Sequence, residues 1–218
     1  MKNELYSLDK NNTWDIVNYS KNTINNYKPL KSRWVYKLKE YSDNTIEFKA
    51  RFVAKGFEQL YGIDYIETFA SVIKQIAWKL LFALAILNNW HIYKIDMIST
   101  FTQGSIDTNI YIYLPEGFID YENRILRLNK ALYGLKQSAR IWYSILKELL
   151  IKLGFEVLNT KSCIFINRRL HIIICIYVDD LAIIGPNLDN INSFIKDIQK
   201  YFKINEPATV GLCVQASF

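Results

Sequence analysis

Two neighbouring stretches near the start of the chain alternate in polarity and are rich in aromatic and β-branched residues. They cover residues 32–40 and 46–54, and the turn-forming run Ser42-Asp43-Asn44 lies between them. Alternation with a period of two is typical of strands whose two faces meet different surroundings. The pattern therefore predicts a β-hairpin.

The rest of the chain switches between helical and extended patterns. Apolar residues recur at helical spacing over 71–88 and again from Gln137 to Leu153, just before Gly154. Short apolar runs bounded by Gly, Pro or polar residues predict strands. The predicted strands cover 91–96, 110–114, about 124–129, a stretch near 163–167, 170–178 and 181–185, and a last helix covers 188–202. This order predicts an α+β fold in which a β-hairpin subdomain precedes a mixed unit.

Length and composition allow one sizeable core or two small abutting ones, because the chain has 218 residues of which 50% are hydrophobic. The apolar segments 80–87 and 172–178 fall far short of the ~20 residues that a membrane span requires. A polar Lys-Asn-Glu run follows Met1 instead of a signal peptide. We therefore expect a soluble, intracellular protein with no membrane partner.

The three cysteines are widely spaced, which argues against a zinc site or a disulfide framework.

The formal charge of +6 and the isoelectric point near 9.0 favour a polyanionic partner if the positive charge is clustered. Solubility alone is the alternative explanation for such a charge. The basic residues of the first quarter are interleaved with aromatic ones, as a nucleic-acid groove requires. These basic residues are Lys28, Lys31, Arg33, Lys37, Lys39, Lys49, Arg51 and Lys55.

Two adjacent acids, Asp179 and Asp180, lie between the apolar runs 172–178 and 181–185. Neighbouring side chains of a strand point to opposite faces, so at most one of these acids can aim squarely at a given site. We expect Asp179 to be the ligand and Asp180 to be the supporting acid. The alternative is an ordinary solvated hairpin turn, in which Asp residues are common.

A third acid, Asp96, ends the predicted strand 91–96. Carboxylates at the ends of two strands that are neighbours in a sheet form an oxygen-rich pocket for hard cations. Two Mg²⁺ ions about 4 Å apart, with Mn²⁺ as a substitute, would activate a primer hydroxyl and stabilise leaving pyrophosphate there. A strand-end cap is the alternative role of Asp96.

Several motifs occur in the order found in one family. The run Tyr177-Val178-Asp179-Asp180 resembles the YxDD signature of reverse transcriptases. Its surroundings resemble copia-type, or pseudoviral, LTR retrotransposons. The further matching runs are SRWVYK at 32–37, FKARFVAKGF at 48–57, YGIDY at 61–65, ETF at 67–69, LPEGF at 114–118 and ALYGLKQS at 131–138. The resemblance implies an RNA-directed DNA polymerase with Asp96, Asp179 and Asp180 as catalytic metal ligands.

The resemblance also implies a nucleotide site. Lys49, Arg51 and Lys55 would hold the incoming triphosphate, since basic side chains suit its concentrated negative charge. Phe101 matches the aromatic residue that packs against the sugar and rejects a 2′-hydroxyl. Residues of the ALYGLKQS run would face the template or nucleotide at a helix start: Tyr133, Gly134, Lys136, Gln137 and Ser138. From the residues alone, solvated lysines, a core phenylalanine and a plain Ser138 helix cap are the alternatives.

The same resemblance divides the chain. Residues 1–30 would be an N-terminal extension and 31–203 the fingers and palm of a right-hand polymerase, with a fingers hairpin at about 31–57 and a palm at about 90–203. The segment 204–218 would be a degenerate or truncated primer-grip tail, with the thumb absent or truncated. The expected partners are an RNA or DNA template with its primer, deoxyribonucleoside triphosphates, and the ribonuclease H and integrase segments of a parent polyprotein.

Three residues depart from the family pattern near these motifs. Thr100 stands in place of a small Ala, Thr102 in place of a Leu and Ala139 in place of a Pro. These changes threaten the rate more than the fold. The truncated primer-grip tail favours a second hypothesis, a catalytically silent nucleic-acid-binding remnant of a decayed element, and a third, a fragment without binding activity. We expect a cytoplasmic location within element-encoded particles, with nuclear entry of the product complex.

Overall fold

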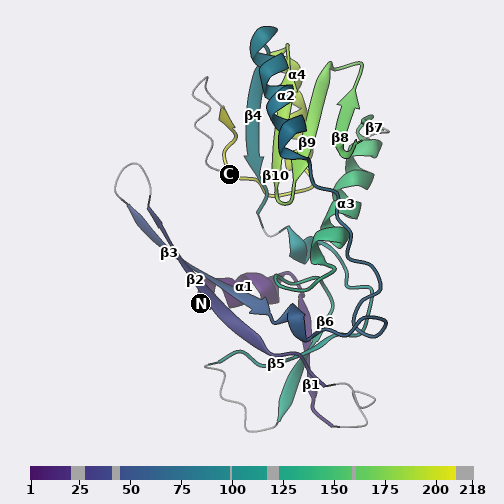
Figure 1. Ribbon diagram of the computed structural model, residues 1–218. Coiled ribbons are helices and arrows are strands. Elements are labelled where there is room, and N and C mark those ends of the chain that lie inside the picture. Colours follow the sequence, from purple (N-terminus) through teal and green to yellow (C-terminus); the bar gives the residue numbers. More distant parts are fainter. Residues whose placement is uncertain (21–27, 41–44, 99, 117–122, 159–160, 210–218) are drawn as a thin grey trace. The chain divides into compact units, whose positions relative to one another are not determined.

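The computed structural model describes residues 1–20, 28–40, 45–98, 100–116, 123–158 and 161–209 (Figure 1). The predicted turn Ser42-Asp43-Asn44, the end of the LPEGF motif and the tail from residue 210 onward lie outside these residues. Within them the fold is mixed, with four α-helices and several sheets. In this part of the chain no helix combines the length and apolar character needed to cross a membrane.

The chain divides into two compact units. The first consists of Met1–Phe69 with Phe101–Trp142, and the second of Ala70–Thr100 with Tyr143–Phe218. The chain passes between the units at three points, and the last of them, after Trp142, falls within helix α3 (Ser138–Lys152). The candidate acids belong to the second unit, and the candidate nucleotide-binding residues belong to the first.

The first unit contains the predicted hairpin, which is confirmed. Strands β2 (Ser32–Glu40) and β3 (Ile46–Ala54) pair antiparallel along their whole length. A separate sheet has the order β1-β6-β5, built from Trp14–Asn18, Arg124–Leu128 and Tyr111–Tyr113. Helix α1 (Lys2–Lys10) packs on β3.

Alternation along the hairpin explains where its core lies. Trp34 and Phe52 are cross-strand partners on one face, and the Phe52 side chain is completely buried. The Phe52 ring meets the Trp14 ring edge-on at a centroid distance of 5.7 Å. The buried core of this unit comprises Leu8, Leu30, Phe52, Ala54, Ile110, Ile112, Leu126, Leu128, Leu132 and Leu135. Leu8 and Leu30 show that the first thirty residues contribute to this core.

The second unit is built on one sheet with the order β11-β4-β10-β9-β8-β7, in which all neighbours are antiparallel. Its strands are β4 (His91–Asp96), β7 (Glu156–Leu158), β8 (Lys161–Asn167), β9 (Ile172–Tyr177), β10 (Asp180–Gly185) and β11 (Ala208–Thr209). The apolar run of β9 fits its central place, because a strand covered on both faces needs apolar residues at every position.

Two helices cover this sheet. Helix α2 (Gln75–Leu87) contributes Phe82 and Ala85 to a core with Ile92, Cys175 and Ala182. Helix α4 (Leu188–Gln199) packs against β10, and its residue Ile191 lies beside Gly185. Gly185 and Ala182 face opposite sides of β10 by strand alternation, so α2 and α4 cover opposite faces (Figure 1).

The described elements differ from the predicted ones in two ways. Helix α2 begins at Gln75 rather than at 71, because Lys74 is extended with φ −68° and ψ 139°. The helix α1 and the strands β1, β7 and β11 were not predicted from the sequence. The short strands β1 and β11 depend on partners far away in sequence, for example Trp14 opposite Leu128 and Ala208 opposite Lys94.

Candidate active site

The sheet of the second unit brings two of the three candidate acids together. Strand β4 ends at Asp96 and strand β10 begins at Asp180, and the antiparallel register makes these two residues direct cross-strand partners. Directly opposite residues share a face and have Cβ atoms about 4.5–5.5 Å apart. The apolar residues of β9 and β10 fix this register by burial, so two carboxylates meet where both strands end.

The third acid lies in the turn between β9 and β10. Tyr177 pairs with Asp180, which leaves Val178 and Asp179 as the two turn residues. Val178 has a φ of 56°, a left-handed conformation that is rare for a β-branched residue and costs about 1–3 kcal/mol. The backbone carbonyl of Asp179 accepts a hydrogen bond from the Met97 N–H at 3.3 Å. The strained turn is thereby held beside the end of β4.

The register bears on the choice between the adjacent acids. The sequence favours Asp179 as the principal ligand, whereas Asp180 is the acid that shares a sheet face with Asp96. The assignment of the principal ligand stays a prediction.

Each paired acid has a partner that sequence reasoning missed. The Lys94 Nζ lies 2.9 Å from Asp180 Oδ2, in an ion pair whose side chains are 36% and 25% exposed. The Asn205 side-chain N–H donates to Asp96 Oδ2 at 2.6 Å. Lys94 stands two residues before Asp96 on a strand, so period-two alternation already predicts a shared face. Asn205 is 109 residues away, and no local pattern indicates its contact.

These residues fit a divalent cation that is completed by substrate. Among the described residues no group of three or more His, Cys, Asp or Glu side chains forms a complete metal site. However, Mg²⁺ is usually held by one or two carboxylates together with substrate phosphates. The pair Asp96 and Asp180, with Asp179 next to it in sequence, supplies hard oxygen donors of that kind.

Nearby in sequence, the Thr100 hydroxyl is buried and is the one buried side-chain polar atom of the described residues that has no hydrogen-bond partner. An unsatisfied buried hydroxyl costs about 1–3 kcal/mol. The departure from Ala at this position therefore has a structural cost.

In the first unit, the candidate basic residues lie on and just after β3. Lys49 is exposed and stands opposite Lys37, while Arg51 and Lys55 are half-buried. Lys49 and Arg51 share one face of the hairpin by alternation. The Arg51 guanidinium lies over the Tyr133 ring, 5.5 Å from its centroid. This stacking fixes the direction of Arg51.

Tyr133 also contacts the candidate sugar-facing residue. The Phe101 ring meets the Tyr133 ring edge-on at a centroid distance of 4.7 Å, and Phe101 is 8% exposed. Arg51, Tyr133 and Phe101 therefore form a continuous row of contacting groups.

The loop around Gly134 fits closely against the end of the hairpin. Gly134 has a φ of 91°, and a Cβ there would collide with the Ala54 carbonyl oxygen. The Ala54 N–H donates to the Tyr133 carbonyl at 2.8 Å. A Cβ at Gly56 would in turn collide with the Gly134 carbonyl oxygen. Both glycines permit a backbone approach that any side chain would block.

The residues after Gly134 are held by internal contacts. Gln137 is fully buried, and its amide bonds to Gln59 at 3.0 Å and to the Asp64 carbonyl at 2.8 Å. The Lys136 ammonium donates to the Tyr65 hydroxyl at 3.1 Å. The buried Ser138 hydroxyl donates to the Leu132 carbonyl at 2.6 Å. The side chains of this turn therefore brace the loop.

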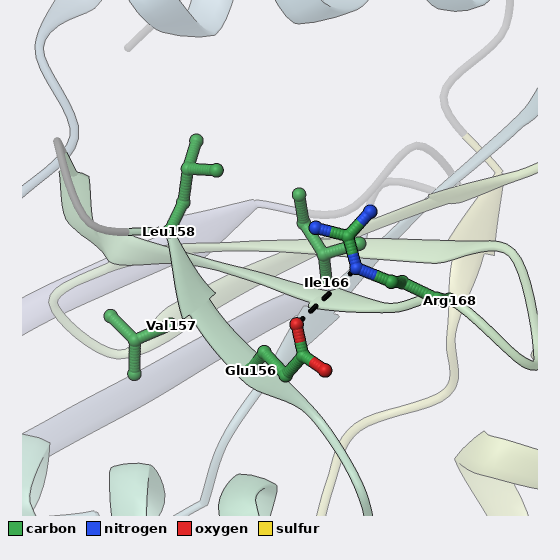
Figure 2. Close-up of a pocket in the computed structure, with 5 residues that line it drawn as sticks. All are labelled: Glu156, Val157, Leu158, Ile166 and Arg168. Atoms are coloured by element: carbon green, nitrogen blue, oxygen red, sulfur yellow. Dashed lines mark hydrogen bonds and ion pairs between the residues drawn. The ribbon is translucent and has the colours of Figure 1, made fainter.

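A separate shallow pocket of about 130 Å³ lies at the β7–β8 edge of the second unit (Figure 2). Glu156, Val157, Leu158, Ile166 and Arg168 line it, and Arg168 Nε lies 3.3 Å from Glu156 Oε2. Both charged side chains are largely exposed, so the ion pair contributes little. This pocket contains none of the predicted site residues.

The comparisons with known proteins agree on one family. The profile described as reverse transcriptase (RNA-dependent DNA polymerase) matches residues 11–214. The retrovirus-related Pol polyprotein from transposon RE1 of Arabidopsis thaliana is 33% identical, over 94% of this chain and 14% of the relative. The corresponding polyprotein from transposon TNT 1-94 of Nicotiana tabacum is 34% identical, over 94% of this chain and 16% of the relative. The transposon Ty1-BL Gag-Pol polyprotein of Saccharomyces cerevisiae is 32% identical, over 91% of this chain and 11% of the relative.

Proposed function

We propose a function that starts from the family of the chain. The chain belongs to the family of reverse transcriptases (RNA-dependent DNA polymerases) and is similar to copia-type Pol polyproteins. By descent it is an RNA-directed DNA polymerase domain. Our proposal is that it acts as the fingers and palm of that polymerase and performs nucleotidyl transfer with two divalent cations. The chain spans about a seventh of the relatives' length, 14% of the first, so the activities of a whole polyprotein belong to the proposal.

The observation that carries the proposal is the register pairing of Asp96 with Asp180 at the end of two strands. Divalent cations bound there would supply charge neutralisation for the attacking hydroxyl and the leaving phosphate. Asp96, Asp179 and Asp180 would hold these cations through oxygen atoms. The rigid sheet beneath them would keep the carboxylates oriented without a loop rearrangement.

The first unit would bind the nucleotide. Lys49, Arg51 and Lys55 would contact the triphosphate, and Arg51 is the best candidate because its stacking on Tyr133 preorders the guanidinium. Phe101, supported by Tyr133, would pack against the sugar. Gly134, Lys136, Gln137 and Ser138 would support this surface through the loop that they brace.

The proposed partners are a template with its primer, deoxyribonucleoside triphosphates, and further segments of a polyprotein such as ribonuclease H and integrase. A cytoplasmic location within element-encoded particles belongs to the same proposal. The second candidate is a silent nucleic-acid-binding remnant. The buried, unsatisfied Thr100 hydroxyl favours it, because this residue follows the strand that carries Asp96.

Primer extension by the purified chain on a homopolymer RNA template tests the proposal. We expect Mg²⁺-dependent extension that Asp96→Asn reduces by about a hundredfold or more. A chain that binds primer–template but never extends it, even when a relative's following segment is joined after Thr209, would support the silent remnant instead. The junction must retain residues 203–209, because this segment pairs with β4.

A further inference from the structure

The segment that follows α4 is attached to the strand of the first candidate acid. Ala208 and Thr209 form β11 and pair with Lys94 and Tyr93 of β4. Nearer α4, the Ile98 N–H donates to the Lys203 carbonyl at 2.9 Å. Residues 203–209 therefore run along the edge of β4 and past its end at Asp96.

Asn205 is the residue of this segment that reaches the acid. Its backbone N–H donates to the Asp96 carbonyl at 3.0 Å, and its side-chain N–H donates to Asp96 Oδ2 at 2.6 Å. An ionised carboxylate only accepts hydrogen bonds, so the amide must present its N–H group to Asp96. A hydrogen bond to an ionised acceptor is about twice as strong as a neutral one.

The chemistry of this contact differs from that at the neighbouring acid. The Lys94 ammonium brings a positive charge to Asp180 and offsets part of its negative charge. The Asn205 amide is neutral, so it orients the Asp96 carboxylate and leaves its full negative charge for a cation. The Asn205 amide donates to Oδ2 of Asp96 and makes no hydrogen bond to Oδ1.

We propose that Asn205 is a positioning residue that holds the Asp96 carboxylate in the orientation required for divalent-cation binding. This inference rests on the proposed function of Asp96. It gives the segment after α4 a role in the site, because the segment delivers the amide to the acid through backbone pairing with β4.

The test measures cation binding by the whole chain without any chemistry. Tb³⁺ is a luminescent substitute for hard cations, and Tyr177, the cross-strand partner of Asp180, is placed to sensitise its emission. Asn205→Leu keeps the size of the side chain but removes the hydrogen-bond donor. We expect it to lower the affinity for Tb³⁺ about tenfold, and the affinity for Mg²⁺, measured by displacement of Tb³⁺, by a similar factor, as for residues that orient metal ligands. Asn205→Gln, which keeps a donor, should recover part of the affinity.

Asn88→Leu is the matched control, because Asn88 is also exposed and its amide donates to the Leu84 carbonyl at 2.7 Å in the same unit. It should lose a similar amount of thermal stability while keeping the wild-type Tb³⁺ affinity. If Asp96→Asn loses Tb³⁺ binding while Asn205→Leu and Asn205→Gln both keep it, the positioning role is refuted and the proposed function stands. If Asp96→Asn itself binds Tb³⁺ normally, the cation site is wrong and both proposals fall.

Discussion

The two sequence motifs that led to the candidate site are used differently by the molecule. Where β4 ends and β10 begins, Asp96 is exposed and Asp180 is half-buried, and the two residues are cross-strand partners. In the loop around Gly134, the side chains of Gln137 and Ser138 are buried and bonded to neighbouring groups. The first motif presents charge, and the second holds a backbone in place.

The difference teaches how to interpret a motif. A run such as ALYGLKQS matches a family of enzymes, yet several of its residues are explained by packing alone. Gly134 is required by its positive φ and its closeness to Ala54, and Gln137 by the internal hydrogen bonds of its buried side chain. The paired acids fill no core position, because Asp96 is exposed and Asp180 is half-buried and ion-paired with Lys94. Chemistry is therefore expected at the acids first.

The largest effect should come from the adjacent acids Asp179 and Asp180. We expect Asp180→Asn to reduce primer extension by about a hundredfold or more, as severely as Asp179→Asn, because Asp180 shares a face with Asp96 and the amide lacks the charge that offsets a cation. Steady-state extension rates at saturating Mg²⁺ measure both variants. A much milder loss for Asp180→Asn would favour Asp179 as the principal ligand, as strand alternation in the sequence suggested.

The next effect concerns the free energy of unfolding and the loop around Gly134. Gly134→Ala places a Cβ against Ala54 at a positive φ and should destabilise the protein by about 2–4 kcal/mol, measured by urea unfolding. Gly62→Ala is the matched control. Gly62 has a similar φ of 80° but nothing within 4 Å of its Cβ position, so about 1 kcal/mol is expected. Equal losses would show that close packing at Gly134 is unimportant.

Sugar selection should change when the Phe101 ring is trimmed. Phe101→Val opens space beside Tyr133, so incorporation of ribonucleotides should rise about tenfold relative to deoxyribonucleotides. Competition between the two nucleotides in one extension reaction measures this ratio. An unchanged ratio in an active variant would assign Phe101 to the core alone.

A smaller effect is expected in the salt dependence of binding. Charge reversal of Arg51 and Lys55 should lower the slope of log affinity against log salt by about one per lost phosphate contact. Fluorescence anisotropy with labelled primer–template measures the slope. Lys196→Glu, an exposed position on α4, is the control and should leave the slope unchanged. Wild-type binding that ignores salt would contradict the nucleic-acid interface itself.

The smallest effect concerns Glu4 on α1. Burial raises the pKa of its carboxyl, while the hydrogen bond from the Phe52 N–H opposes that shift in part. A raised folded-state pKa means that stability is greatest when the group is protonated and falls as the pH rises through the folded pKa. Glu4→Gln should remove this loss, so its melting temperature should vary less above the ordinary carboxyl range. Parallel melting curves for the two proteins would contradict this effect.

Local patterns were sufficient for the main elements. Alternation in 32–40 and 46–54 predicted β2 and β3, and the apolar runs beside Asp179 predicted β9 and β10 within two residues. These segments have strong local signals, and burial on both faces of β9 leaves little freedom. The start of α2 was predicted four residues too early, at 71 instead of Gln75, because no capping side chain marks it.

The contacts that complete the site could not be predicted in the same way. The pairing of Asp96 with Asp180 depends on which strands are neighbours, and the contact of Asn205 with Asp96 depends on a segment far along the chain. Likewise, the interlocked glycines Gly56 and Gly134 each appear in a sequence motif, but their mutual approach is a tertiary property.

A double-mutant cycle on Asp96 and Asp180 tests most directly the claim that the two acids act as one cation site. The quantity measured is the extension rate of wild type, Asp96→Asn, Asp180→Asn and the double variant, each at saturating Mg²⁺. Residues that act as a unit are strongly non-additive, so the double variant should lose little more than either single variant. Losses that multiply in the double variant would show that the acids act independently, and would contradict the shared site.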